Sequence, residues 1–261
     1  MSRAAALLCS VACISGARAV ELKPETVQAF NQYIHGAEAR LDKRLAPGAH
    51  FLWVDDDGPR LTQVRGGQLA IESLTGKGAR EIPGGLIHDW IGAIFIPGVT
   101  LEKTLALIQD YNHHQFYYKP EVMVSRLISR HGNDFKVYLR LMKHKFITVI
   151  LDTYYDVHYF PLSGGRCYSR AYSTRIVEVE DAGKPDEHDL PPGNDSGYLW
   201  RLDSYWSFEQ RDGGVYVECE AISLTRGIPA GLGWLIEPVV NNLPRESLAN
   251  TLLKLRVALR K

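Results

Sequence analysis

The order of strand-like and helix-like segments after Leu86 constrains this sequence most. An apolar segment at 86–96 precedes two short helix-like segments, and an amphipathic helix is predicted at 246–260. Between them lie six strand-like segments, at 122–130, 135–143, 146–159, 167–179, 198–210 and 215–224. Successive strands joined by short loops pair as antiparallel hairpins. The sequence therefore predicts an α+β domain in which a curved antiparallel seven-stranded sheet wraps around one long C-terminal helix.

The segment before this domain has a different pattern. An amphipathic helix with Pro24 at its start is predicted over 24–44. Two short extended pieces, 50–54 and 61–64, flank an Asp-rich turn and predict a β-hairpin extension, and a further strand is predicted at 68–73. The Gly-rich stretch 75–85 is interpreted as a linker. We therefore divide the mature chain into 20–85 and 86–261.

The first 19 residues have the pattern of a secretory signal peptide. Arg3 precedes an apolar run at 4–14, and Ala17-Arg18-Ala19 resembles a cleavage site. The run is shorter than the ~20 apolar residues that a membrane-spanning helix needs. We expect cleavage after Ala19 and a periplasmic or secreted protein, with a membrane anchor or a lipoprotein on Cys13 as alternatives.

Composition excludes several classes of function. Apolar residues make up 45%, charged residues 23%, and the formal net charge is zero. Nucleic-acid binding would need a basic patch, so no nucleic-acid partner is expected. Cys167 and Cys219 are interpreted as small buried hydrophobic residues. No hydrolase nucleophile motif or nucleotide-binding glycine motif is present, and we expect no cofactor.

Tight turns set the predicted strand registers. A two-residue turn at 132–133 would place Ile128 opposite Val137 and Arg126 opposite Leu139. Arg126 would then be the one charge on an apolar inner face. A buried cation needs a partner, which would be either a polar group of a ligand or an internal carboxylate.

The last hairpin, turning at 212–213, predicts a second set of inner residues. Phe208 would oppose Val217, Trp206 would oppose Cys219, and Ser204 would oppose Ala221, with Trp200 and Leu202 on the same face. Large aromatic residues facing small ones would line a cavity or simply fill a core. Glu218, Glu220 and Tyr205 are predicted on the opposite face, toward solvent.

Two segments leave alternatives open. A two-residue turn at 144–145 would place Asp152 on the inner face, against the hydrophobic pattern, unless a bulge intervenes. Asp152, Asp156 and His158 share one strand face, but without further ligands nearby we expect no metal site. The stretch 227–236, with Trp234, would form a gate or a transient membrane contact, or else the first turn of the final helix.

Several segments together resemble a known superfamily. They are residues 88–92 (HDWIG), 125–126 (SR), 138–141 (YLRL), 205–209 (YWSFE), 214–220 (GVYVECE) and 231–236 (GLGWLI). From about Leu86 to Arg260 the chain resembles the START-like, or SRPBCC, helix-grip superfamily of lipid and hydrophobic-ligand carriers. The resemblance implies a cavity between the sheet and the C-terminal helix. Its members include passive binders, ubiquinone-binding relatives and aromatase or cyclase enzymes, so it leaves chemistry open.

We therefore predict non-catalytic binding or transport of a hydrophobic or amphipathic, lipid-like ligand. The alternatives are an aromatase/cyclase-type enzyme using Arg170, Tyr172 and Arg175 in an acid–base site, and a structural module that binds a protein partner. The predicted ligand-binding residues are Arg126, Val137, Leu139, Trp200, Leu202, Trp206, Phe208, Cys219, Ala221 and Trp234.

Overall fold

The computed structural model describes residues 22–76, 78–144, 148–191, 193–227 and 233–260, without the side chains of 233–241. The predicted signal peptide at 1–19 lies outside these residues, and so does the side chain of Trp234. No helix in the described ranges has the length and hydropathy of a membrane span.

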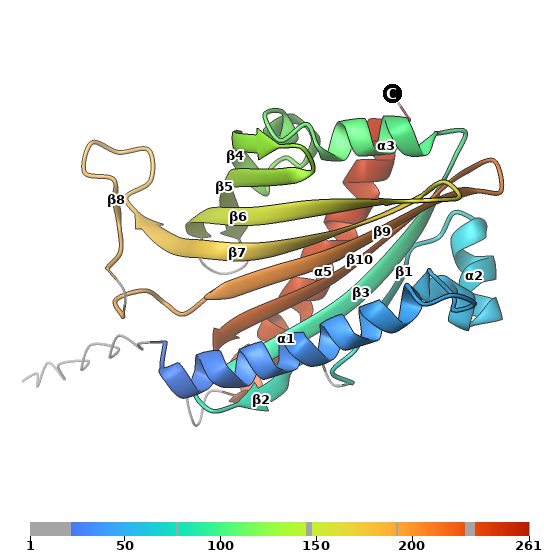
Figure 1. The fold of residues 1–261 in the computed structure, drawn as a ribbon. Helices are drawn as coiled ribbons and strands as arrows, with labels where there is room; N and C mark the ends of the chain where they lie inside the picture. Colours follow the sequence, from blue (N-terminus) through green and yellow to red (C-terminus); the bar gives the residue numbers. More distant parts are fainter. Residues whose placement is uncertain (1–21, 77, 145–147, 192, 228–232, 261) are drawn as a thin grey trace, which may run out of the picture.

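A ten-stranded antiparallel sheet forms the centre of the molecule, with the path β1-β3-β10-β9-β7-β6-β5-β4 and with β2 and β8 paired at its sides (Figure 1). The strands are β1 (Ala70–Ser73), β2 (Arg80–Ile82), β3 (Gly85–Pro97), β4 (Val122–His131), β5 (Asp134–His144), β6 (Thr148–Leu162), β7 (Arg166–Glu180), β8 (His188–Asp189), β9 (Arg201–Arg211) and β10 (Gly214–Arg226). All seven predicted strands after Leu86 are present, which confirms the predicted fold class. The segment predicted as a linker contributes β2, which pairs with β3.

Helices cover both faces of the sheet. Figure 1 shows α1 (Pro24–Arg44) along one face and α5 (Gly233–Leu259) across the opposite face. Alternate residues of β3 pack on opposite faces of the sheet. Ile87 and Ile91 belong to the cluster with α1, whereas Trp90 and Ile94 belong to the cluster with α5. This double burial explains why the segment is almost entirely apolar, with His88 and Asp89 as its buried polar residues. The predicted stripe of α1 is confirmed at Phe30, Ile34, Ala37 and Leu41.

The predicted β-hairpin extension is wrong. Residues Trp53–Asp56 form a 3-10 helix, η1, and Gly58–Arg65 form a helix, α2. The side chain of Asp57 accepts a hydrogen bond from the Arg60 amide, and Pro59 lies in the first turn. Asp57-Gly58-Pro59 is therefore a helix start, which the sequence interpretation took for a turn.

The two predicted hairpin registers differ in outcome. The β9–β10 register is confirmed, with Phe208 opposite Val217, Trp206 opposite Cys219 and Ser204 opposite Ala221. In β4–β5 the register shifts between Val122 and Val124 and again between Leu127 and Ser129. Arg126 therefore pairs with Tyr138, not Leu139. A one-residue slip moves a side chain to the other face of a sheet, and Arg126 is exposed.

The conflict at Asp152 has a simple resolution. His144 pairs with Thr148, so the connection is longer than a two-residue turn. Asp152 then lies opposite Arg140, whose guanidinium donates to both carboxylate oxygens at 2.7 and 2.9 Å. The carboxylate is on the outer face, as the hydrophobic pattern required.

Two short helices, α3 (Leu101–Ile108) and α4 (His114–Tyr117), connect β3 to β4. Helix α5 begins before the predicted start at residue 246 and includes Pro244. Its predicted buried positions are confirmed at Leu248, Leu252, Leu255 and Leu259, while Val257 is exposed.

Candidate functional site

The central strand β9 has two faces with different exposure. Its residues on the α1 side, Asp203, Tyr205 and Ser207, are 6%, 4% and 7% exposed. Those on the α5 side, Leu202, Ser204 and Trp206, are only half-buried, as is Ala221 on β10. We call Leu202, Ser204, Trp206 and Ala221 the concave patch. Residues on central strands beneath a helix are normally buried. The partial exposure of these four side chains therefore shows that solvent reaches this part of the α5 face.

Small side chains explain the access. One row across four strands places Trp90 of β3 beside Ala221 of β10, then Ser204 of β9, then Ala171 of β7. Side chains in such a row point to the same face. Three consecutive small residues leave little to fill the space below α5, while Trp90 forms a wall at one end of the row.

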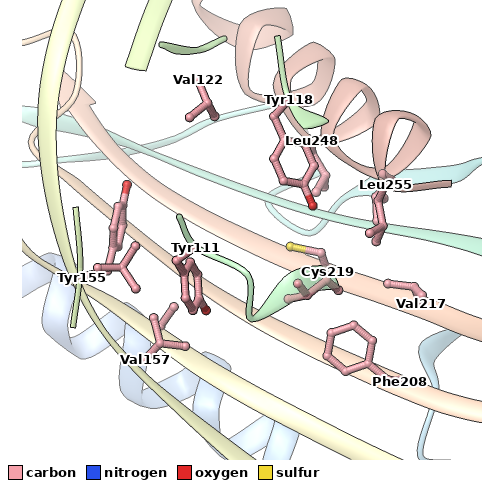
Figure 2. Packing of buried hydrophobic residues seen from close by; sticks show 14 of the residues in the cluster. Tyr111, Tyr118, Val122, Tyr155, Val157, Phe208, Val217, Cys219, Leu248 and Leu255 are labelled. Atoms are coloured by element: carbon pink, nitrogen blue, oxygen red, sulfur yellow. The ribbon is translucent and has the colours of Figure 1, made fainter. Parts of the chain in front are cut away.

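The other end of the concave side is closed. Figure 2 shows Leu255 of α5 among the residues that pack there with Val217 and Phe208. All three of these side chains are fully buried. A Cβ atom on Gly92 would lie 2.8 Å from Leu252 Cδ1, so a larger residue here would force the Leu252 side chain to move. The C-terminal half of α5 is therefore fixed on the sheet, and the concave patch lies toward the beginning of β9.

Two polar atoms in the α5-side cluster have no hydrogen-bond partner in the described chain. They are the indole Nε1 of Trp90 and the hydroxyl oxygen of Tyr155. Both side chains are at least nine-tenths buried, and burial raises the pKa of Tyr155 to about 12. Buried donors are almost always satisfied. A donor beside a solvent-accessible patch can therefore serve an acceptor on a bound molecule.

The sheet divides next to the concave patch. Pairing of β7 with β9 stops at Ala171 and Ser204, although β7 continues to Glu180. Beyond that point the Ser173 amide donates to Asp203 Oδ1 at 3.0 Å, and the Leu202 amide donates to Ser173 Oγ at 2.9 Å. Burial raises the pKa of Asp203 to about 6. These polar contacts replace the missing ladder bonds.

The α1 side of the sheet is closed, and a polar network accompanies its apolar cluster. Arg40 donates to Asp89 Oδ2 at 3.1 Å and to Glu220 Oε1 at 3.0 Å, and the Tyr33 hydroxyl donates to Asp89 Oδ2 at 2.8 Å. Glu218 accepts the amides of Trp53 and Val54 at 2.8 and 2.9 Å. The prediction that Glu218, Glu220 and Tyr205 face solvent is wrong, because α1 and η1 cover them.

Burial sets the titration of these acids. It raises the pKa of Glu218 to about 7. It also raises the pKa values of Asp89 and Glu220, which lie together and repel each other when both are ionised, while Arg40 opposes the shift. These groups line no described cavity and all engage α1 or η1. These acids serve to attach α1 and η1 to the sheet.

Two of the three residues proposed for an alternative acid–base site also attach to α1. Arg170 donates to Asp42 of α1 at 2.6 Å, and the Tyr172 hydroxyl donates to Glu38. Arg175 pairs with Asp189 on β8. No group of three or more metal-ligating side chains occurs in the described part of the chain.

The structure brings most of the predicted ligand-binding residues to the α5 side. They are Val137, Leu139, Leu202, Trp206, Phe208, Cys219 and Ala221. Trp200 instead packs on the α1 side, and its Nε1 donates to Asp195 at 3.1 Å. Arg126 is exposed on the outer face. Trp90 and Tyr155 were missed, because the place of Trp90 beside Ala221 depends on the long-range pairing of β3 with β10.

No protein-family model and no curated protein matches the sequence. The order of the elements, with an antiparallel sheet closed by the long terminal helix α5, is that of the predicted helix-grip fold. Solved structures similar to it include a STAR-related lipid transfer protein from Xanthomonas axonopodis, at 18% identity and TM-score 0.48, covering 74% of this chain and 99% of that one.

Two further similar structures carry different names. The Zhui aromatase/cyclase from Streptomyces sp. R1128 has 6% identity and TM-score 0.45, covering 67% of this chain and 94% of that one. Human STARD10 has 12% identity and TM-score 0.43, covering 81% and 83%. Lipid transfer and cyclase chemistry both occur among these names, so they do not choose between the two functions.

Proposed function

We propose that this protein binds a hydrophobic or amphipathic small molecule without covalent chemistry, between the sheet and α5. The observation that carries the proposal is the contrast along β9, where Leu202, Ser204 and Trp206 remain accessible while their neighbours on the α1 side are buried. Accessible apolar surface on the inner side of a curved sheet is favourable to cover with an apolar molecule.

The unpaired donor of Trp90 predicts that the ligand carries a polar group. Trp90 Nε1 lacks a partner in the described chain, and Trp90 is directly beside Ala221 of the concave patch. An indole N–H only donates. A ligand with a carbonyl, ether or hydroxyl oxygen at this end would satisfy it.

Binding alone is favoured over the cyclase alternative by the composition of the patch. Leu202, Ser204, Trp206 and Ala221 include no group that titrates near neutral pH. General acid–base catalysis needs such a group within reach of the substrate. The candidates for that role, Arg170 and Tyr172, bind α1 on the other face.

A substitution that fills the patch tests the proposal. Ala221→Trp places a large ring over the small residues, and we expect Nile red to bind at least tenfold more weakly while the protein stays folded. Val257→Trp, on the exposed side of α5, is the matched control and should bind the dye as the wild type does. Unchanged dye binding by a folded Ala221→Trp protein would refute the proposed position. Native mass spectrometry of the purified protein would identify the molecule that it carries.

We also propose that the protein is exported and acts in the periplasm or outside the cell. The support is the sequence pattern of residues 1–19. N-terminal sequencing of protein from the exported fraction should begin at Val20 or within a few residues of it. An intact Met1 in that fraction would contradict cleavage.

A further inference from the structure

Exposed apolar side chains gather at one edge of the sheet. Phe116 of α4 is 60% exposed, and Met123, Val124 and Ile128 of β4 are 44%, 37% and 54% exposed. Of the large apolar side chains that are exposed in the described chain, only Leu162 and Val257 lie elsewhere. We call the four residues of α4 and β4 the β4 edge. In Figure 1, β4 is at the upper border of the sheet.

The local backbone presents these side chains outward. Met123 and Ile128 lie at the two register shifts of β4, where the strand has no direct partner residue on β5. Such bulges bend an edge strand and re-aim its side chains. The Gln115 amide donates to Ser125 Oγ at 3.1 Å, which holds α4, and with it Phe116, against β4.

Basic side chains flank the apolar ones on both faces of the edge strand, with Arg126 opposite Tyr138 on the outer face and Arg130 opposite Phe135 of the α5-side cluster. Lys119, Arg126 and Arg130 lie over the rings of Phe116, Tyr138 and Phe135, with their charged atoms 5.5, 4.6 and 4.6 Å from the ring centroids. In the described residues no carboxylate lies within ion-pair distance of any of the three cations, whereas the neighbouring Glu121 is paired with Lys254. Arg130 also donates through Nε to the Gly132 carbonyl oxygen at 3.0 Å, and its other guanidinium N–H groups remain for another acceptor. Apolar stems on the protein with charged ends that lack a carboxylate partner match the boundary between lipid and water.

The backbone of this edge is poorly suited to another strand. The Leu127 amide already donates to Asn112 Oδ1 at 2.9 Å, and the two bulges interrupt the ladder. Bulged and covered edges oppose edge-to-edge pairing. A second copy of the chain or an extended peptide would therefore find few free backbone groups here.

We propose that the β4 edge docks on the surface of a bilayer that contains anionic phospholipid. The exposed apolar side chains would enter the boundary between head groups and acyl chains, and the three cations would lie among phosphate groups. This surface is separate from the concave patch, and the proposal does not depend on the identity of the ligand. It also differs from the membrane contact that the sequence suggested for 227–236.

Hydrogen–deuterium exchange of the full chain with vesicles locates the contact. Peptides covering 112–131 should become protected with phosphatidylcholine–phosphatidylglycerol vesicles, and less so with phosphatidylcholine alone or at high salt. This readout is local, so attachment through the apolar N-terminus would not produce it.

Two double variants separate the apolar and the charged contributions. Phe116→Ser/Ile128→Ser should abolish the local protection. Arg126→Gln/Arg130→Gln should weaken the vesicle-concentration dependence of that protection on the order of fivefold per cation. Val257→Ser is the apolar control, and Arg175→Gln/Lys184→Gln, at cations paired with Asp189 and Asp181, is the charge control. Both controls should behave as the wild type.

Several outcomes would overturn the proposal. They are protection that is absent with every vesicle, protection that survives in the two double variants, and loss of protection in the controls to the same degree. Analytical ultracentrifugation tests the remaining alternative, in which a second copy of the chain binds the β4 edge. A dimer that forms without lipid and is lost in Phe116→Ser/Ile128→Ser would assign the edge to a second copy and reject the membrane. Melting temperatures within a few degrees of the wild type would show that the variants are folded.

Discussion

The two faces of the sheet are covered by helices in different ways. On the α1 side, side chains of Arg40, Tyr33 and Glu218 make directed hydrogen bonds to partners far away in the sequence, and the sheet residues below are buried. On the α5 side the packing is tight around Gly92 and Leu252 and incomplete over the concave patch, and α5 also makes polar contacts such as that of Arg256 with the Gly67 carbonyl oxygen. A polar network above a closed apolar cluster fixes one relative position of two layers, whereas packing that leaves apolar surface accessible has room for a bound molecule.

This contrast predicts how much stability the protein loses when a side chain on each face is replaced by alanine. Phe30, on α1, is 2% exposed, so Phe30→Ala should lower the free energy of unfolding by about 3–5 kcal/mol. Leu202 is already partly reached by solvent, so Leu202→Ala should cost at most about 2 kcal/mol, the low end for a buried leucine. Urea denaturation of both variants checks the difference. Equal costs would mean that the α5 side is a filled core and that the two faces do not differ.

The buried carboxyl group of Glu218, on the α1 side, predicts that the free energy of unfolding depends on pH. Its pKa of about 7 in the folded protein is above the usual value of ~4.3 for an unfolded glutamate. Its stabilising contribution is therefore full below about pH 4 and is lost as the pH rises through 7. Between pH 5 and pH 8 the wild type should lose on the order of 1–3 kcal/mol relative to Glu218→Gln.

Urea denaturation at several pH values measures this difference. Glu72→Gln, at a partly exposed carboxylate paired with Arg60, is the control and should leave the pH dependence of the wild type unchanged. A Glu218→Gln protein whose stability follows the wild type at every pH would show that this carboxyl does not titrate on folding.

The smallest expected effect concerns the unpaired donor on the α5 side. Trp90→Phe removes Nε1 and keeps most of the ring, so the affinity for the natural ligand should fall by about 0.5–1.5 kcal/mol. The stability of the free protein should be unchanged or higher, because a buried unpaired N–H is removed.

Trp200→Phe is the matched control on the α1 side. It breaks the bond from Trp200 Nε1 to Asp195, so it should reduce stability and leave ligand affinity intact. Calorimetric titration and thermal melting measured on both variants separate the two effects. An unchanged affinity in Trp90→Phe would remove this donor from the binding site.

Local sequence determined the elements and some of their pairing. Period-two and helical patterns predicted the seven strands after Leu86, α1 and the buried stripe of α5, because one buried face imposes these periods. The turn at Asp212 and Gly213 also fixed the register of β9 and β10, because a two-residue loop leaves no freedom in it.

Only the tertiary structure decided what each face contacts. The bulges of β4 changed the direction of Arg126, and no single residue marks them in the sequence. Glu218 and Glu220 have the alternation of a solvent-facing strand, yet η1 covers Glu218 and α1 covers Glu220, from 165 and 180 residues earlier in the chain. The row from Trp90 to Ala171 exists only because β3 pairs with β10 and β7 with β9. Periodicity reports that a side chain is on one face of a strand, but what covers that face depends on distant segments of the chain.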